Sequence, residues 1–543
     1  MSLLSWWWPL GTTIATALFG ILSALVLVRP AWKARFAGAV AMVLSASLAV
    51  LTVGLTSNLK MGFVENLDHV ANLLAADDTP AKTVDHPALP PAEDGSLGED
   101  TAPSSAPEWK LNFAPFFSPH TQQAPFTGPE SKVESSITVW LPEDYSPTDG
   151  KTYSVIEFLH GLPGSAKGVV EALDWENTYR ELIEAGTIGP TIFVMPDLLS
   201  SQGEPQCRDL QGQPQMETWV TRDVPKAIRS NFPNVSDKRA DWVLAGISAG
   251  AYCSANLSLR YPQTYSAGLS FSGYDRPLLG PLSDSDTHTR LENTISAMAA
   301  TLDHPAALYI AATESDPDAV EMLNNVAARA RGHLRLATHV QSDGGHSWAT
   351  WGKQLPAALA WWRGLPADGV KAGEDGSAPA KQPLAAVGGD DFVPVVAKTQ
   401  GPFTLTGSGT VVAVWGLALL LAGFAIFTGG RGRRDFVDQE TAPGLASSPR
   451  RESDVRLPSS PRREPAADLA SSPRRESDPP REPAPARRWP SWLSPWWVLP
   501  RNLLTVAVAA ITIAVAMLVT INADSAFFTS FSDLSSGWRT MFP

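Results

Sequence analysis

The sequence predicts an α/β domain with a mostly parallel sheet, preceded by two transmembrane helices and followed by two more. Strand-like apolar runs alternate with helical stretches between residues 129 and 365, as in a parallel sheet with helices on both faces. Four other stretches are apolar over nearly the length that crosses a bilayer. A Gly-x-Ser-x-Gly sequence, Gly246–Gly250, lies between a strand-like run and a helical stretch.

Composition excludes several classes of protein. The 543 residues are too many for one compact domain and enough for a large enzyme core with added segments. The formal net charge of −13 argues against nucleic acid as a partner. The two cysteines and nine histidines form no zinc-like cluster in the sequence, so we expect neither a metal nor a cofactor.

The four apolar stretches are predicted to cross a membrane. They run over Leu10–Val28, Phe36–Thr56, Thr410–Thr428 and Leu503–Ile521. The alternative for each is a buried core helix, but none of the four has a charged face. A cleaved signal peptide is not expected, because no basic residue precedes the first stretch and a second follows at once.

Basic residues beside these spans indicate their orientation. A four-span topology places three clusters on one side: Arg29, Lys33 and Arg35; Arg431, Arg433 and Arg434; Arg487, Arg488 and Arg501. Loops rich in Lys and Arg face the cytoplasm. We therefore expect a multi-pass plasma-membrane protein whose N-terminus, α/β domain and C-terminal tail are extracytoplasmic.

The predicted organisation has eight parts. They are two transmembrane helices (1–60), an extracytoplasmic linker with a short helical piece at 62–76 (61–128), the α/β domain (129–365), a second linker (366–408), a transmembrane helix (409–429), a cytoplasmic loop (430–500), a transmembrane helix (501–523) and an extracytoplasmic tail (524–543). The loop repeats S-S-P-R-R-E from Ser447, Ser459 and Ser471 and is expected to be disordered. We interpret it as a solvated spacer, with binding of anionic lipid headgroups or phosphorylation as alternatives.

Within the α/β domain the elements follow one another in a regular order. Strands are expected at 135–142, 153–159, 191–196, 242–245, 266–272, 306–312 and 336–340, and helices at 217–232, 251–261, 291–302, 318–331 and 355–362.

Ser248 is the candidate nucleophile. Gly246 and Gly250 flank it closely enough for the sharp strand-to-helix turn that exposes a serine hydroxyl at the end of a sheet. The backbone N–H of Ala249 then points to where an oxyanion would form.

A serine needs a base to take its proton and an acid to orient that base. His346, in a glycine-containing loop between the last strand and the last helix, is the candidate base. The strand at 306–312 ends in T-E-S-D-P-D, so Glu314, Asp316 and Asp318 are the candidate acids. A second oxyanion donor is expected from His160-Gly161-Leu162, as the N–H of Gly161 or Leu162, against the alternative of an ordinary tight turn.

These segments together resemble the putative-esterase family of α/β-hydrolases, which includes esterase D, feruloyl-esterase-like enzymes and mycolyltransferases. The resemblance covers 132–362 and depends on H-G-L-P-G-S, M-E-T-W-V-T-R-D-V-P-K-A-I, A-G-I-S-A-G-A-Y and D-G-G-H-S-W-A-T-W. It implies an α/β-hydrolase fold and a serine esterase activity. The esterase branch has an aspartate at the position of Asp316, whereas the mycolyltransferase branch uses a glutamate in this region, which leaves Glu314 as the second candidate acid. His160 and Pro163 differ from the residues of the mycolyltransferase branch.

Cys207 and Cys253 are predicted to form a disulfide, because their domain is expected to face an oxidising compartment. The alternative is a pair of buried free cysteines.

Three functions are compatible with these features. The first is a membrane-tethered serine esterase that hydrolyses carboxylic esters of the cell envelope or of lipid-like molecules outside the cytoplasm. The second is acyl transfer from the same acyl-enzyme to an envelope glycan or lipid. The third is a non-catalytic membrane scaffold, which the coincidence of elbow, acid, base and H-G loop disfavours.

Overall fold

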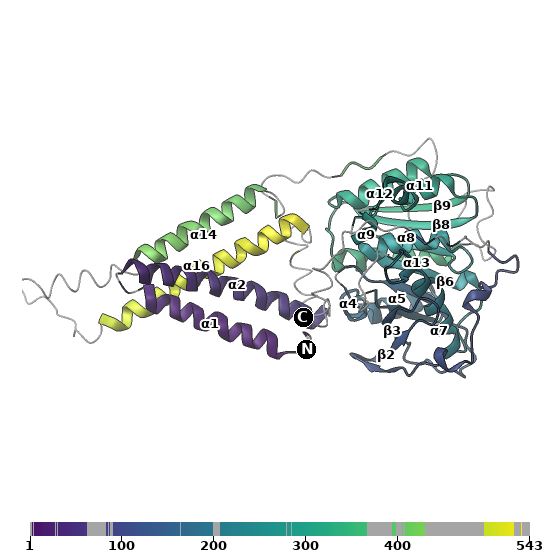
Figure 1. Ribbon diagram of the computed structural model, residues 1–543, viewed down its shortest axis with the longest axis horizontal. Coiled ribbons are helices and arrows are strands. Elements are labelled where there is room, and N and C mark those ends of the chain that lie inside the picture. The colour runs from purple at the N-terminus through teal and green to yellow at the C-terminus, as the bar shows by residue number, and fades with distance from the viewer. Residues whose placement is uncertain are drawn as a thin grey trace, which may run out of the picture. The chain divides into compact units, whose positions relative to one another are not determined.

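The structure is a computed structural model (Figure 1). It describes residues 5–27, 31–61, 91–162, 164–198, 207–278, 280–283, 285–365, 394–397, 408–428 and 494–525, with residues 3, 29, 83, 84, 86, 404, 405 and 534. Several predicted features lie outside the described residues: the helical piece at 62–76, Pro163, the S-S-P-R-R-E repeats and most of the C-terminal tail.

The chain divides into two compact units. One comprises Met1–Thr16, Ala46–Leu417 and Thr512–Pro543 and contains the α/β domain; the other comprises Ala17–Ser45 and Ala418–Ile511. Both include parts of four helices that are long and apolar enough to cross a membrane, α1 (Trp7–Leu27), α2 (Trp32–Met61), α14 (Ser408–Thr428) and α16 (Ser494–Ser525). The predicted arrangement of two such helices before the domain and two after it is confirmed.

Hydroxyl groups join these helices in pairs. In the second unit, Ser23 of α1 donates to the carbonyl oxygen of Gly38 in α2 over 2.7 Å. In the first unit, Thr52 donates to Thr12 over 2.9 Å, and Trp415 Nε1 of α14 donates to Thr520 of α16 over 2.9 Å. Small and hydroxyl-bearing residues are typical of contacts between helices in lipid, where close backbone approach and hydrogen bonds replace the hydrophobic effect.

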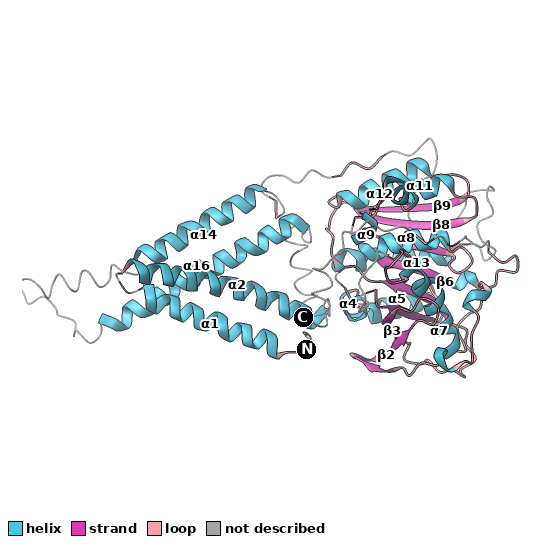
Figure 2. Ribbon diagram, in the orientation of Figure 1, coloured by secondary structure: helices cyan, strands magenta, loops and turns pink. Residues whose placement is uncertain are grey.

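A nine-stranded sheet forms the centre of the α/β domain, as the magenta arrows of Figure 2 show. Its spatial order is β1-β2-β3-β5-β4-β6-β7-β8-β9. The strands are β1 (Ala114–Phe116), β2 (Ser118–Thr127), β3 (Glu134–Trp140), β4 (Ser154–Leu159), β5 (Thr191–Pro196), β6 (Trp242–Ile247), β7 (Ala267–Phe271), β8 (Ala306–Thr313) and β9 (Leu334–Gln341). All pairings from β5 to β9 are parallel, while β1, β2 and β3 pair antiparallel. The predicted mostly parallel sheet is confirmed.

The sheet begins earlier than residue 129, where the sequence places the start of the domain. β2 pairs with β3 from Thr121 opposite Trp140 to Thr127 opposite Glu134. Its sequence, S-P-H-T-Q-Q-A-P-F-T, contains two prolines and few apolar residues, which is typical of a linker. Proline is tolerated here because Pro125 lies beyond the three residues of β1, where the outer edge of β2 has no further strand in the sheet.

Helices cover both faces of the sheet. One face packs against α7 (Val224–Asn231), α8 (Ala249–Arg260), α11 (Ile295–Thr301) and α12 (Pro317–Arg329), and the other against α4 (Ala166–Ala172), α5 (Trp175–Glu184) and α13 (Trp348–Arg363). Side chains alternate between these layers: Val155 and Leu159 of β4 belong to the first, Ile156 and Phe158 to the second. Shorter elements complete the domain: η1 (Glu99–Thr101), η2 (Pro107–Trp109), α6 (Met216–Thr218), the π-helical turn η3 (Trp219–Asp223), η4 (Arg239–Asp241), α9 (Gly280–Ser283) and α10 (Thr287–Glu292).

Candidate active site

Ser248 occupies a sharp turn between β6 and α8. Its φ of 54° and ψ of −120° lie in a strained region for a residue with a side chain. The flanking glycines make the turn sterically feasible. A Cβ on Gly246 would lie 2.2 Å from the carbonyl oxygen of Gly250, and one on Gly250 would lie 2.2 Å from that of Leu159. The backbone N–H of Ser248 donates to the carbonyl oxygen of Phe271 over 3.0 Å, which anchors the turn to β7.

A chain of two hydrogen bonds connects Ser248, His346 and Asp316. His346 Nε2 lies 2.9 Å from Ser248 Oγ, and His346 Nδ1 lies 3.0 Å from Asp316 Oδ2. An ionised carboxylate only accepts hydrogen bonds, so Nδ1 carries the ring proton and Nε2 is free to receive the proton of Ser248. This is the arrangement of a nucleophile, a general base and an orienting acid.

The path of the backbone after β8 determines which of the three candidate acids contacts His346. Asp316 is the N-cap of α12 and is 6% exposed; its Oδ1 accepts from the N–H of Ala319 over 3.3 Å. Pro317 at the first helical position favours this helix start. The carboxylate that meets His346 is therefore that of Asp316, while Glu314 is half-buried and Asp318 is exposed on the first turn of α12.

His346 is supported from the start of α13. Ser347 is the N-cap of this helix, so His346 immediately precedes the cap and Trp351 is the fourth helical residue. Side chains at these two positions commonly pack together and set the angle at which the chain enters a helix. Here the two rings meet edge to face, with centroids 5.1 Å apart and an angle of 86° between their planes. The signal for this contact in the sequence is H-S-W-A-T-W, in which an aromatic residue follows His346 by five positions.

Two backbone segments border the Ser248 hydroxyl. Ala249 is the first residue of α8, and the first N–H groups of a helix have no partner within that helix. Gly161 follows β4 on the neighbouring strand. A Cβ built on Gly161 would lie 3.1 Å from Ser248 Cβ and 3.6 Å from Ser248 Oγ, so a side chain at this position would crowd Ser248. The segments of Ala249 and Gly161, from which the sequence predicts the oxyanion donors, thus both adjoin Ser248.

His160 has contacts that its sequence motif does not reveal. Its ring is fully buried, and Nδ1 lies 2.7 Å from the carbonyl oxygen of Gly161. On the other side of the ring, Nε2 lies 3.0 Å from the backbone nitrogen of Leu198 and 3.1 Å from Asp197 Oδ1. A carbonyl oxygen only accepts, so Nδ1 donates to Gly161 in either charge state of the ring. In a trans peptide the N–H of Leu162 points away from this carbonyl, so the His160 bond fixes the direction of that N–H.

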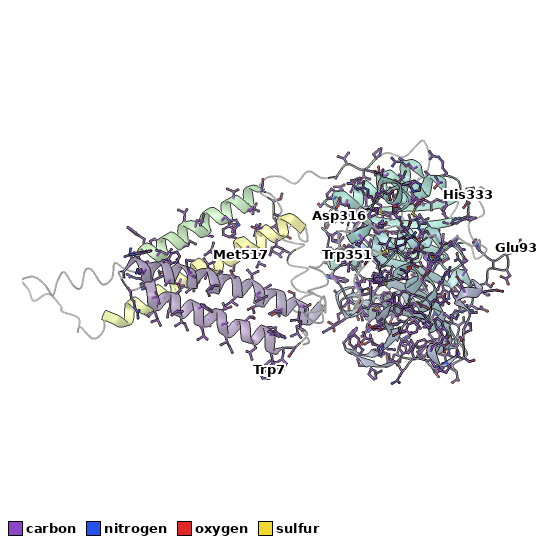
Figure 3. All side chains as sticks on the ribbon, in the orientation of Figure 1. Trp7, Glu93, Asp316, His333, Trp351 and Met517 are labelled. Atoms are coloured by element: carbon purple, nitrogen blue, oxygen red, sulfur yellow. A yellow bond between two sulfur atoms is a disulfide. The ribbon has the colours of Figure 1, made fainter. Side chains whose placement is uncertain are left out.

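All these groups lie at the carboxyl ends of the parallel strands. Gly161 follows β4, Ser248 follows β6, Asp316 follows β8 and His346 follows β9. In Figure 3, Asp316 and Trp351 are labelled on one side of the domain, whereas His333, which directly precedes β9, lies on the opposite side. Open α/β sheets commonly bind their ligands outside the carboxyl ends of their strands.

A disulfide joins the helix after Ser248 to the loop before α6. Cys207 and Cys253 are bonded, with Cα atoms 5.7 Å apart and a separation of 46 positions in the sequence. Next to this bond, Arg208 forms an ion pair with Glu217, and both side chains are almost completely buried. Tyr261, at the end of α8, donates to the other oxygen of Glu217 over 2.9 Å. The loop is thus held to α8 at two places: at Cys253 by the disulfide, and at Tyr261 through Glu217 and its ion pair with Arg208.

His86, Asp209 and Glu217 form the one group among the described residues whose donor atoms are close enough to hold a metal ion, all within 4.8 Å. Each donor already has a protein partner. His86 Nε2 lies 2.8 Å from Asp209 Oδ2, Thr218 donates to both oxygens of Asp209, and Arg208 pairs with Glu217. The hydrogen bond with Asp209 raises the pKa of His86 above its usual value, against partial burial. The three side chains are therefore already engaged with protein partners.

Comparison with known proteins places the site in a family. Residues 129–362 match the family model described as "Putative esterase", which confirms the resemblance seen in the sequence. An uncharacterized protein of Corynebacterium glutamicum is 28% identical over 189 residues, which cover 32% of this chain and 44% of that relative; the match thus spans less than half of the relative's length. Among solved structures, a ferulic acid esterase is 17% identical, with 45% of this chain and 97% of that chain covered and a TM-score of 0.37. An S-formylglutathione hydrolase from Agrobacterium tumefaciens is 16% identical, with 46% and 97% covered and a TM-score of 0.37.

Proposed function

Because residues 129–362 belong to the putative-esterase family of α/β-hydrolases, we propose that the chain is a serine esterase held at a membrane by its long apolar helices. The observation that carries this proposal is the continuous chain of hydrogen bonds from Asp316 through His346 to Ser248, set on a strained turn between β6 and α8. Ser248 is the nucleophile, His346 the general base and Asp316 the residue that orients His346.

The geometry supports a two-step reaction. Ser248 Oγ attacks the ester carbonyl carbon while its proton passes to His346 Nε2, and the carbonyl oxygen becomes an oxyanion. The N–H groups of Ala249 and of Gly161 or Leu162 stabilise that charge. The tetrahedral intermediate then collapses: the bond to the alcohol oxygen breaks, and the alcohol leaves with the proton from His346.

Water completes the cycle. It attacks the acyl-Ser248 carbonyl and gives one proton to His346 Nε2; the second intermediate releases the carboxylic acid, and the proton returns to Ser248 Oγ. Asp316 accepts the Nδ1–H bond throughout and stabilises the imidazolium that forms in each step.

We place the domain outside the cytoplasm on two grounds. The Cys207–Cys253 disulfide suits an oxidising compartment. Loops rich in Lys and Arg are expected to face the cytoplasm, and a four-span topology then puts the domain on the other side of the membrane. The substrates that such a domain meets are carboxylic esters of the cell envelope or of membrane lipids.

Hydrolysis of a short-chain p-nitrophenyl ester by the full-length protein tests the assignment. Ser248→Ala and His346→Ala should each lower kcat by at least a thousandfold. His288→Ala is the matched control, because His288 lies exposed on α10, and it should keep full activity. Unchanged turnover in Ser248→Ala would overturn the proposal. Addition of a sugar acceptor to the same assay distinguishes hydrolysis from acyl transfer, because transfer diverts the acyl group from water to the sugar.

A further inference from the structure

Part of the linker between the domain and α14 is fastened to α12. Asn324 Nδ2 donates to the carbonyl oxygen of Val395 over 2.8 Å, and the N–H of Val395 donates to Asn324 Oδ1 over 2.9 Å. One side-chain amide thus satisfies both backbone groups of one residue, as a neighbouring β-strand would. We call this pair of hydrogen bonds the Asn324 clamp.

The clamped segment also packs against the core. Val395 and Ala397 contact the hydrophobic cluster on the α12 face of the sheet, whereas Val396 between them is 84% exposed. This alternation is that of an extended segment with one side buried. The sequence around it, F-V-P-V-V-A, is the apolar exception in a linker otherwise rich in Gly, Ala, Pro and charged residues.

The linker before the domain is fastened as well. Thr83 forms a β-bridge with Leu210, the N–H of Val84 donates to the carbonyl oxygen of Asp209 over 2.7 Å, and His86 pairs with the side chain of Asp209. Asp209 and Leu210 are completely buried. Both linkers therefore contact the domain through residues that lie far along the chain from them.

The clamp shortens the free segment of chain between the domain and α14, which we call a tether, as we do the segment between α2 and the domain. Without the clamp, 43 peptide units separate Leu365, where the domain ends, from Ser408, where α14 begins, and they could extend over about 150 Å. With the clamp, the 11 units from Ala397 to Ser408 reach at most about 40 Å. On the other side, the 22 units from Met61 to Thr83 reach at most about 80 Å. The segment after the clamp is therefore the limiting tether.

The clamp lies close to the proposed active site. Asn324 is eight residues beyond Asp316 on α12, which corresponds to about 12 Å along the helix. We propose that the Asn324 clamp keeps the active site near the membrane surface, and that its substrate is a carboxylic ester anchored in that same membrane. This inference rests on the proposed esterase function for its substrate, but not for the clamp itself.

The test uses full-length protein in lipid vesicles and two fluorophosphonate probes, one soluble and one attached to a lipid headgroup by a short spacer. Asn324→Leu removes the side-chain amide that forms the clamp. Val395→Asp keeps the backbone groups of the linker but puts a charge where the Val395 side chain packs against the core, and should displace the clamped segment. Asn177→Leu is the matched control, because Asn177 lies exposed on α5 and its side-chain amide donates to Asp174 three residues earlier. A dye on a cysteine introduced at the exposed Glu184 reports energy transfer to a membrane acceptor; both native cysteines are in the disulfide.

When the clamp is released, the N-terminal tether of about 80 Å becomes the shorter of the two and limits how far the domain can move from the membrane. Effective concentration falls roughly as the −3/2 power of tether length, so labelling of Ser248 by the lipid-anchored probe should drop about threefold in either clamp variant. Labelling by the soluble probe should not change, and energy transfer should decrease. The control variant should match the wild type in all three measurements.

The outcomes separate the two proposals. Unchanged energy transfer in both clamp variants would show that the clamp does not hold the domain. Reduced energy transfer with undiminished labelling by the lipid-anchored probe would refute the membrane-anchored substrate. Failure of both probes to label wild-type Ser248, with energy transfer still sensitive to the clamp, would refute the esterase and leave the clamp intact.

Discussion

The ring of Trp351 meets the ring of His346 edge to face, at 5.1 Å between centroids. Trp351 is 5% exposed and also packs at a steep angle against Trp348. This contact restricts rotation of the His346 ring away from Ser248 and Asp316, and edge-to-face packing of two rings is itself favourable.

Replacement of Trp351 should therefore lower kcat more than it changes KM. We expect Trp351→Leu to reduce kcat about tenfold, and Trp351→Phe, which retains an aromatic ring at this position, to recover most of the loss. Steady-state kinetics on the two variants measures this, with the melting temperature followed in parallel. Equal kcat values for the Leu and Phe variants would show that the aromatic character of Trp351 does not matter.

His160 should act through the direction of the Leu162 N–H. Phenylalanine at position 160 removes the donor to the carbonyl oxygen of Gly161 and should reduce kcat on the order of 100-fold, as for loss of an oxyanion donor. Asparagine places an amide nitrogen near the position of Nδ1 and should restore part of the rate. The measurement is kcat for both variants, together with the affinity for a boronic acid, which mimics the tetrahedral intermediate. Full activity in His160→Phe would contradict this role.

Glu157 should make the stability of the domain depend on pH. It is completely buried in β4, and this burial raises the pKa of its carboxyl well above the usual value of 4.5, although the hydrogen bond from Tyr265 opposes the shift. The folded state keeps the proton while the unfolded chain releases it above pH 4.5. The contribution of Glu157 to the free energy of unfolding is therefore fully present below pH 4.5. It is lost as pH rises, by up to about 1.4 kcal/mol per pH unit.

Glu157→Gln removes this ionisation without changing the size of the side chain. Its free energy of unfolding relative to the wild type should increase as pH rises above 4.5 in denaturant titrations. If the two proteins show parallel pH dependence, Glu157 is ionised in the folded state and the reasoning fails.

Loss of the disulfide should destabilise the domain. In the chain-entropy model a loop of this length contributes about 3–4 kcal/mol. The double variant Cys207→Ala/Cys253→Ala should unfold at correspondingly lower denaturant and be insensitive to reductant, whereas reductant should lower the stability of the wild type. In isolated membranes, a thiol reagent should label the wild type only after reduction. Labelling without reduction would place the domain in a reducing compartment and remove one ground for the proposed orientation.

Local patterns in the sequence were sufficient for much of this protein. The apolar runs predicted the strands β3 to β9, and four long apolar stretches predicted α1, α2, α14 and α16. Gly246, Ser248 and Gly250 predicted the turn between β6 and α8 because its tight backbone requires small neighbours. In each case the deciding interactions lie within a few residues of one another, so periodicity and turn chemistry report them directly.

The tertiary structure decided what local patterns leave open. Glu314, Asp316 and Asp318 were all compatible with the end of β8, and only the path into α12 brings Asp316 to a histidine 30 residues away. β2 became a strand because β3 and β1 pair with it, despite its prolines. The Asn324 clamp joins residues 71 positions apart. Such contacts depend on which surfaces the folded sheet brings together, and no local spacing in the sequence encodes that geometry.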